Sequence, residues 1–148
     1  MKRNLLFAAL FASLATLSAT QAFARDTVDN YPVAPALQSE PGKVSDDIAL
    51  YFAGQQHPAV LKTIGEFATN KKTNAFGKSD LAACQHVFLS AVIELQERAR
   101  KEGGNAVINI KSNYKNEVRE SATEFTCGAG AVIAGVALKG DVVTLRGK

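Results

Sequence analysis

The cysteine and the histidine at positions 84 and 86 are the side chains that most directly suggest chemistry. A cysteine near a histidine can supply a thiolate nucleophile, and both residue types ligate metal ions. The spacing argues against both roles, because residues two apart on a helix point about 200° away from each other. We therefore expect Cys84 on the core side of a helix and His86 on its solvent side.

The glycine-rich stretch FTCGAGAVIAGVALKG, residues 125–140, has the composition of a phosphate-binding loop. A dinucleotide loop needs G-x-G-x-x-G between a strand and a helix, but Ile133 stands at the third glycine position. A P-loop needs Gly-Lys followed by Ser or Thr, whereas Lys139 precedes Gly140 here. The apolar run is also too short for a membrane-spanning helix. We therefore predict one long strand whose small residues let a helix or a neighbouring chain approach closely.

Other patterns typical of enzymes and metal sites do not occur in the sequence. His57, His86, Asp46 and Asp47 are available as ligands besides the cysteines, but no H-x₃-H, C-x-x-C or H-E-x-x-H spacing occurs. The sequence has no G-x-S-x-G elbow for a nucleophilic serine. We therefore expect a protein that is not an enzyme, with no cofactor and no resident metal ion.

Residues 1–24 have the layout of a secretory signal peptide. Lys2 and Arg3 precede an apolar run that extends to about residue 17, and an A-x-A cleavage motif ends at Ala24. We expect a periplasmic or secreted protein with no membrane span after cleavage. Removing Lys2 and Arg3 from the 17 basic residues leaves 15, against 14 acidic ones. This small excess gives no electrostatic basis for nucleic-acid binding.

Cys84 and Cys127 are the two cysteines of the chain. Because an exported protein folds in an oxidising compartment, an even pair of cysteines first predicts a disulfide bond. The two residues are 43 apart in sequence. Closing a loop of that size stabilises a protein by about 4 kcal/mol in the chain-entropy model.

The rest of the chain predicts one domain behind an extended leader. Residues 25–47 contain three prolines and no apolar periodicity, which is typical of an extended leader or tether, although Val33, Ala36 and Leu37 could dock on the domain. The domain then covers residues 48–148. Its expected strands lie at residues 48–52, within 60–70, at 106–110, and from 119 to about 145, with a final strand at 141–145 if residues 139–140 form a turn.

One long helix is predicted over residues 81–102, capped by Ser79 or Asp80 and ended by Gly103 or Gly104. Its apolar stripe is expected to pack on the sheet, and the facing residues are, on the helix, Phe88, Val92, Leu95 and Ala99 and, on the sheet, Val107, Phe125, Val132 and Val136. Leu89 and Ile93 lie off this stripe. Either the leader covers them, or they form an oligomer or partner surface.

The blocks CQHVFLSAVIELQERARKEGGNAVINI and TEFTCGAGAVIAGVALKG resemble a family of small exported bacterial proteins that carry the label "excinuclease ATPase subunit". This close resemblance covers about residues 48–140. More distantly, the pattern of a helix, GNAV, a strand and CGAGA resembles the stress-sensor lipoprotein RcsF and the YbjQ-type domain, which is described as heavy-metal binding. Cys84 and Cys127 match disulfide-bonded cysteines of RcsF, but its third, fourth and lipidated cysteines have no counterpart here. The likeness to YbjQ-type domains, which form rings, implies a homo-oligomer.

Together these features predict an α+β domain with one long helix on a mixed or antiparallel sheet of four to five strands. We expect a non-enzymatic binding or interaction module with an envelope protein as partner, in envelope stress or assembly. One alternative is an oligomer that binds a metal ion or a small ligand. Another is a thiol–disulfide redox protein that uses Cys84 and Cys127.

Overall fold

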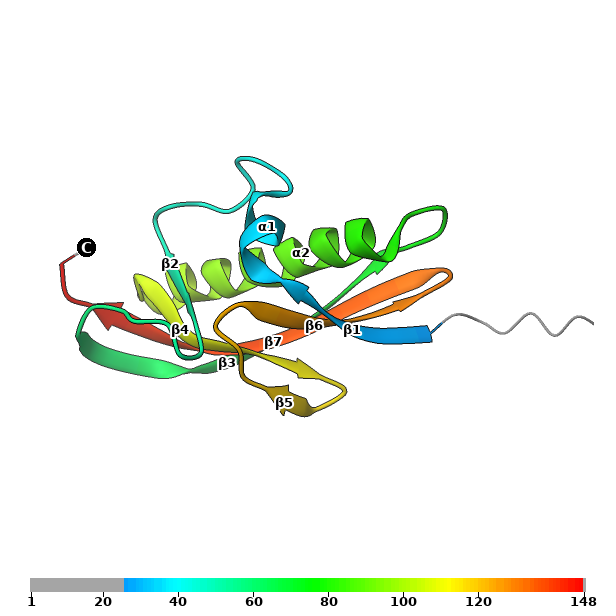
Figure 1. The fold of residues 1–148 in the computed structure, drawn as a ribbon. Coiled ribbons are helices and arrows are strands. Elements are labelled where there is room, and N and C mark those ends of the chain that lie inside the picture. The colour runs from blue at the N-terminus through cyan, green and yellow to red at the C-terminus, as the bar shows by residue number, and fades with distance from the viewer. Residues whose placement is uncertain (1–25, 148) are drawn as a thin grey trace, which may run out of the picture.

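A seven-stranded mixed sheet carries the long helix α2, Asp80–Glu102, on one face (Figure 1). The short helix α1, Val33–Gln38, lies against α2. The computed structural model describes residues 26–147, so the predicted signal peptide lies outside the described residues. Neither described helix is long and apolar enough to cross a membrane. The strands are β1 Asp26–Pro32, β2 Ala49–Phe52, β3 Val60–Asn74, β4 Ala106–Tyr114, β5 Glu117–Arg119, β6 Glu124–Gly130 and β7 Ile133–Leu145.

Strand β7 bonds to three other strands. β3 pairs antiparallel with it from end to end on one edge. The other edge is shared, because β6 pairs beside Ala134 and Gly135 while β4 pairs between Leu138 and Val143. β1 continues the sheet beyond β6, and β2 and β5 pair with β4. The predicted long helix on a mixed sheet is therefore confirmed, but four to five strands were too few.

Residues 125–140 form a hairpin and not one long strand. β6 ends at Gly130, Ala131 and Val132 make the turn, and β7 begins at Ile133. Gly140 was expected in a turn but lies inside β7, where a Cβ atom would stand 2.8 Å from Cγ1 of Val107. The glycine is needed there because the register of the neighbouring β4 shifts between Ile108 and Lys111 and its Val107 and Ile110 side chains come close to Gly140.

The segment 26–47 belongs to the folded domain and is not a tether. β1 pairs antiparallel with β6, which places Tyr31 opposite Phe125. Pro32 then precedes the first turn of α1, a position where a proline ring costs no helical hydrogen bond. Val33 and Ala36 are buried in the core, so the docking of these residues is confirmed. The prolines divide this segment into a strand and a helix instead of keeping it extended.

Residues 39–48 run along α2 and are attached to it by side chains. Nε2 of the buried Gln96 donates to the carbonyl oxygens of Ser45 and Ile48, both at 2.8 Å, and its Oε1 accepts from the Ser45 amide. Arg100 donates to both carboxylate oxygens of Asp47, at 2.6 and 2.8 Å. These bonds, with a further one from the Ser45 hydroxyl, hold the pKa of the Asp47 carboxyl well below its ordinary value.

The ends of α2 follow from its terminal residues, as predicted. The Ser79 hydroxyl accepts a hydrogen bond from the Ala82 amide at 3.1 Å, which satisfies one of the free donors of the first turn. Gly103 then adopts a left-handed conformation with φ 81°. This conformation favours glycine and ends the helix before β4.

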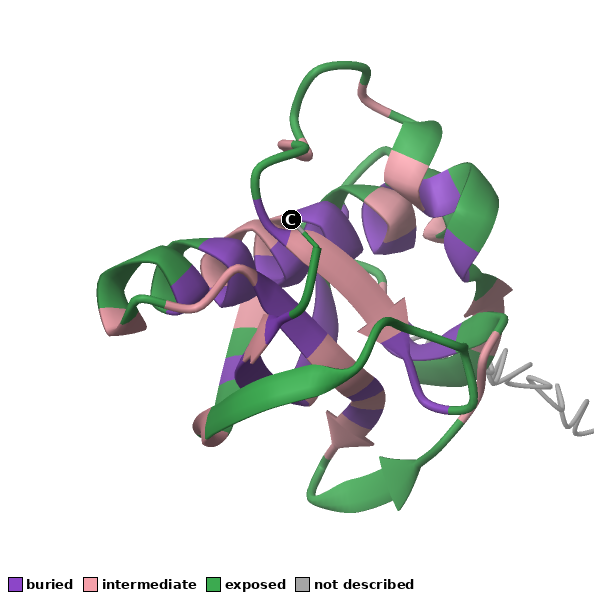
Figure 2. Cartoon of the chain, turned by 90° about the vertical axis from the view of Figure 1, so that its left-hand side faces the viewer, coloured by how far each residue is buried: buried purple, intermediate pink, exposed green. Residues whose placement is uncertain are grey.

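The core lies between α2 and the sheet. A disulfide bond joins Cys84 of α2 to Cys127 of β6, and the rings of Phe88 and Phe125 stack with their centroids 4.0 Å apart. The predicted facing residues are confirmed except for Val132, which lies exposed in the β6–β7 turn. Figure 2 shows buried stretches where α2 meets the sheet, whereas β5 and the first part of β3 are exposed.

Replacing both cysteines, Cys84→Ala with Cys127→Ala, should lower the free energy of unfolding by about 4 kcal/mol, because the bond constrains a loop of 43 residues in the unfolded chain. Urea unfolding followed by circular dichroism measures this change. Reduction of the unaltered protein should produce a similar loss. A loss below about 1 kcal/mol in both measurements would contradict the structural role.

Gln96→Ala should lower the free energy of unfolding by about 1–3 kcal/mol, because the backbone carbonyls of Ser45 and Ile48 lose their donor. Gln85→Ala is the matched control, since this half-buried glutamine of the same helix makes none of these bonds. The control should change stability by less than about 0.5 kcal/mol. Equal urea midpoints for the two variants would argue against the attachment.

Candidate functional site

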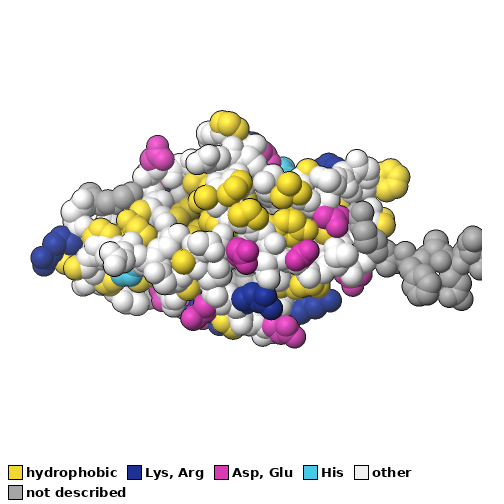
Figure 3. Space-filling model, in the orientation of Figure 1, with side chains coloured by type: hydrophobic (Ala, Val, Ile, Leu, Met, Phe, Trp, Pro, Cys, Tyr) yellow, Lys and Arg dark blue, Asp and Glu magenta, His cyan; other side chains and the backbone are white. Residues whose placement is uncertain are grey.

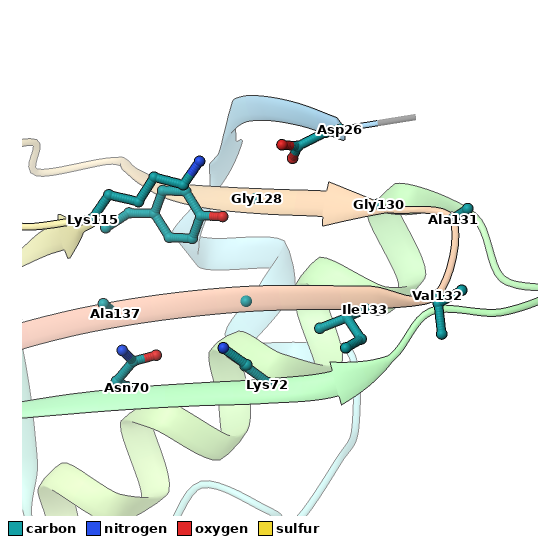
Figure 4. A pocket seen from close by; sticks show the side chains of 12 residues that line it. Asp26, Asn70, Lys72, Lys115, Gly128, Gly130, Ala131, Val132, Ile133 and Ala137 are labelled. Carbon is teal, nitrogen blue, oxygen red and sulfur yellow. The ribbon is translucent and has the colours of Figure 1, made fainter. Parts of the chain in front are cut away.

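The face of the sheet opposite α2 contains a hollow of about 500 Å³ (Figure 4). Side chains alternate along β7, and Ala134, Val136 and Leu138 belong to the core beneath α2. The alternate residues Gly135 and Ala137 therefore face the other way and line the hollow. With so little side-chain volume at these positions, the backbone of β7 forms the floor of the hollow.

Tyr114 forms one wall of this hollow. Its ring lies directly on Gly128 of β6, where a Cβ atom would stand 1.8 Å from the tyrosine Oη. A Cβ atom on Gly135 would stand 3.6 Å from the same ring and 3.8 Å from Cγ of Lys72. The tyrosine ring and the lysine stem thus border a narrow slot, and Gly135 lies at its base.

The β4–β5 hairpin holds Tyr114 in this place. Lys115 and Asn116 have φ angles of 52° and 62° and make the tight turn, which suits the twist of two antiparallel strands. The Ser112 hydroxyl accepts a hydrogen bond from the Thr126 amide at 2.8 Å and attaches the hairpin to β6. The tyrosine is therefore fixed by backbone geometry on one side and by a buried hydrogen bond on the other.

The hollow continues into two smaller ones of opposite character. A hollow of about 240 Å³ shares Asn70 and Lys115 with the first and adds Asn113 and Asn116. Another hollow, of about 460 Å³, shares Lys72 and the β6–β7 turn with the first and adds Phe76 from the β3–α2 loop. We call the three together the open-face groove. It runs from an amide-rich end to an apolar end.

The apolar end combines two loops. Phe76, Val132 and Ile133 are 73%, 58% and 54% exposed. The Ala75 amide donates to the Val132 carbonyl oxygen at 2.7 Å, which fastens the β3–α2 loop to the β6–β7 turn. Figure 3 shows hydrophobic side chains at the end of the molecule where these loops lie. Three exposed apolar side chains held in one place mark a surface suited to contact with an apolar group.

Three charged side chains line the central hollow. Lys72 on β3 and Lys115 beyond β4 lie on either side of β7, and Asp26 lies beside β6 near its end (Figure 4). Within residues 26–147, neither lysine forms an ion pair. The Lys115 Nζ lies 5.5 Å from the centroid of the Tyr114 ring, close enough for a cation–π contact. Both ammonium groups are therefore available to an anion.

The residues selected from the sequence lie elsewhere. Cys84 and Cys127 are bonded to each other in the core, and His86 on the solvent side of α2 pairs with Glu40 at 2.5 Å. Leu89 is only 2% exposed within the single chain, and Ile93 is half-buried. Leu89 thus offers little surface to a partner, and the oligomer or partner surface stays a prediction.

Sequence reasoning missed the groove, although its glycines were noticed. They were interpreted as room for a helix or a neighbouring chain, whereas Tyr114 of the same chain approaches Gly128 from the face opposite α2. In the described part of the chain, no group of three or more His, Cys, Asp and Glu side chains is placed to hold a metal ion. The groove therefore provides lysines, amides and apolar walls for binding.

No protein-family model matches the chain, and no curated protein matches it either.

Gly128→Ala should lower the free energy of unfolding by about 1–3 kcal/mol, because the new methyl group overlaps the Tyr114 ring. Gly135→Ala is the matched control, since its methyl group would meet neighbours at an ordinary 3.6 Å. Urea unfolding of both variants measures the difference. The cost of Gly128→Ala should vanish in a Tyr114→Ala background, and a cost that persists there would contradict the contact.

Proposed function

We propose that the protein is an exported, non-enzymatic binding module and that the open-face groove is its binding surface. The observation that carries this proposal is the slot over Gly135, which the Tyr114 ring and the Lys72 stem border. An apolar hollow with a few polar groups at its edge is the usual form of a ligand site. The tight turn and the hydrogen bond that hold Tyr114 support a preformed slot.

An exported location is supported by two observations of different kinds. The N-terminal residues have the pattern of a signal peptide, and Cys84 and Cys127 form a disulfide bond. Such bonds persist mainly in oxidising compartments outside the cytoplasm. An envelope protein or a second copy of the chain as partner remains part of the proposal.

Binding is favoured over thiol–disulfide exchange because both cysteines are fully buried. Exchange requires a thiolate to attack a disulfide sulfur, so the sulfur must be accessible. Here the bond lies beneath α2 in the core, next to the stacked rings of Phe88 and Phe125. We therefore assign the Cys84–Cys127 bond to stability.

Photo-crosslinking in living cells tests the binding surface. A photoreactive amino acid at Ile133, which lines the groove, should give a specific adduct. The matched control is Leu61, which is 58% exposed against 54% for Ile133 and lies near the opposite end of β3. Adducts should form at Ile133 and not at Leu61. Equal yields at both positions, or no adduct at either, would overturn the proposal.

A further inference from the structure

We infer that the ligand of the open-face groove is a single-chain amphipathic anion, an extended apolar chain that ends in a carboxylate. The inference rests on the proposed function, because it names the chemical class that this groove would bind. It follows from the order of polar and apolar groups along β7, from the two lysines without ion pairs within the described residues, and from the slot between the Tyr114 ring and the Lys72 stem.

The amide-rich end suits the carboxylate. Lys115 and Asn70 line both the central hollow and the smaller hollow beside it, where Asn113 and Asn116 add further amide groups. Ammonium and amide N–H groups donate hydrogen bonds, and a carboxylate only accepts them. Asp26 pairs with Gly130, so the carboxylate among the lining residues lies toward the apolar end. The amide-rich hollow is lined by Lys115 and amides and by no carboxylate, so an anionic head is favoured at this end.

The slot over Gly135 suits an unbranched chain. The Tyr114 ring and the Lys72 stem both lie within 4 Å of the position that a Cβ atom on Gly135 would occupy. A space bordered this closely from two sides accepts methylene groups more readily than a branched or bulky group. The Lys72 side chain contributes its apolar stem to the wall while its ammonium group stays in water.

The apolar end continues the same path. Ile133 is two residues from Gly135 on β7 and therefore points to the same face of the sheet. Beyond it, Val132 and Phe76 line the outer hollow. From Ala137 to Ile133 the strand rises about 13 Å, a length suited to an extended acyl chain of medium length. The exposed side chains at this end would lose water when such a chain covers them.

Dodecanoate is the probe that tests this inference, at concentrations below those at which it forms micelles. Amide chemical shifts of the purified protein should change along the groove, at Lys72, Gly128 and Gly135. Dodecyltrimethylammonium has the same chain and the opposite charge, and acetate has the head without the chain. We expect both to bind at least tenfold more weakly than dodecanoate.

Two variants test separately the contributions of the carboxylate head and of the apolar chain to binding. Lys115→Gln should weaken dodecanoate binding about fivefold through loss of the charge. Lys71→Gln is its matched control, because Lys71 lies one residue from Lys72 but pairs with Glu94 of α2 on the other face. Gly135→Ala should weaken binding by partly filling the slot while the protein keeps its thermal midpoint.

Vesicles of phosphatidylglycerol distinguish a free acyl anion from the anionic surface of a bilayer. The inference predicts binding to dodecanoate without binding to these vesicles. Binding to vesicles alone, equal affinity for dodecanoate and its cationic counterpart, or shift changes confined to α2 would each overturn it. Specific crosslinking at Ile133 with no binding of dodecanoate would overturn the ligand class and leave the binding surface in place.

Discussion

β4 and β6 must share one edge of β7, and the form of the sheet follows from the way in which that edge is divided between them. β4 pairs beside β7 with a change of register near Asn109, and Gly140 opposite this irregularity has no side chain to obstruct Val107 and Ile110. Beyond Ser112, β4 leaves β7 to pair with β5, and β6 takes its place along the edge. The β4–β5 hairpin places Tyr114 over β6. The groove therefore lies where β4 separates from β7.

The two faces of the sheet differ in their side chains and packing. On one face, the disulfide bond fixes the first half of α2, and Gln96 and Arg100 hold the second half to the segment that precedes β2. This face supplies most of the buried apolar surface, which drives folding. The other face is left with glycine, alanine and lysine at its centre. Changes at groove positions with room around them, such as Gly135, should therefore leave the core intact.

Local signals in the sequence predicted α2, its caps and the disulfide bond, because each depends on neighbouring residues or on a simple pair. The β6–β7 turn was missed because Ala131 and Val132 are not typical turn residues. β1 was missed because its pairing with β6 is distant and prolines follow it. The groove was beyond prediction for a related reason. Lys72, Tyr114 and Gly135 come from three strands, and only the pairing register brings them together.

The pairing of β1 with β6 also constrains the order in which the chain can fold. Asp26 lies opposite Gly130, so the first described strand to be synthesised bonds to one that follows most of the chain. Contacts between such distant segments form slowly, because a long loop must close before they contribute stability. The backbone groups of β1 therefore lack their β6 partners until β6 has been synthesised. The sheet therefore gains its β1 edge only after residues 124–130 have been synthesised.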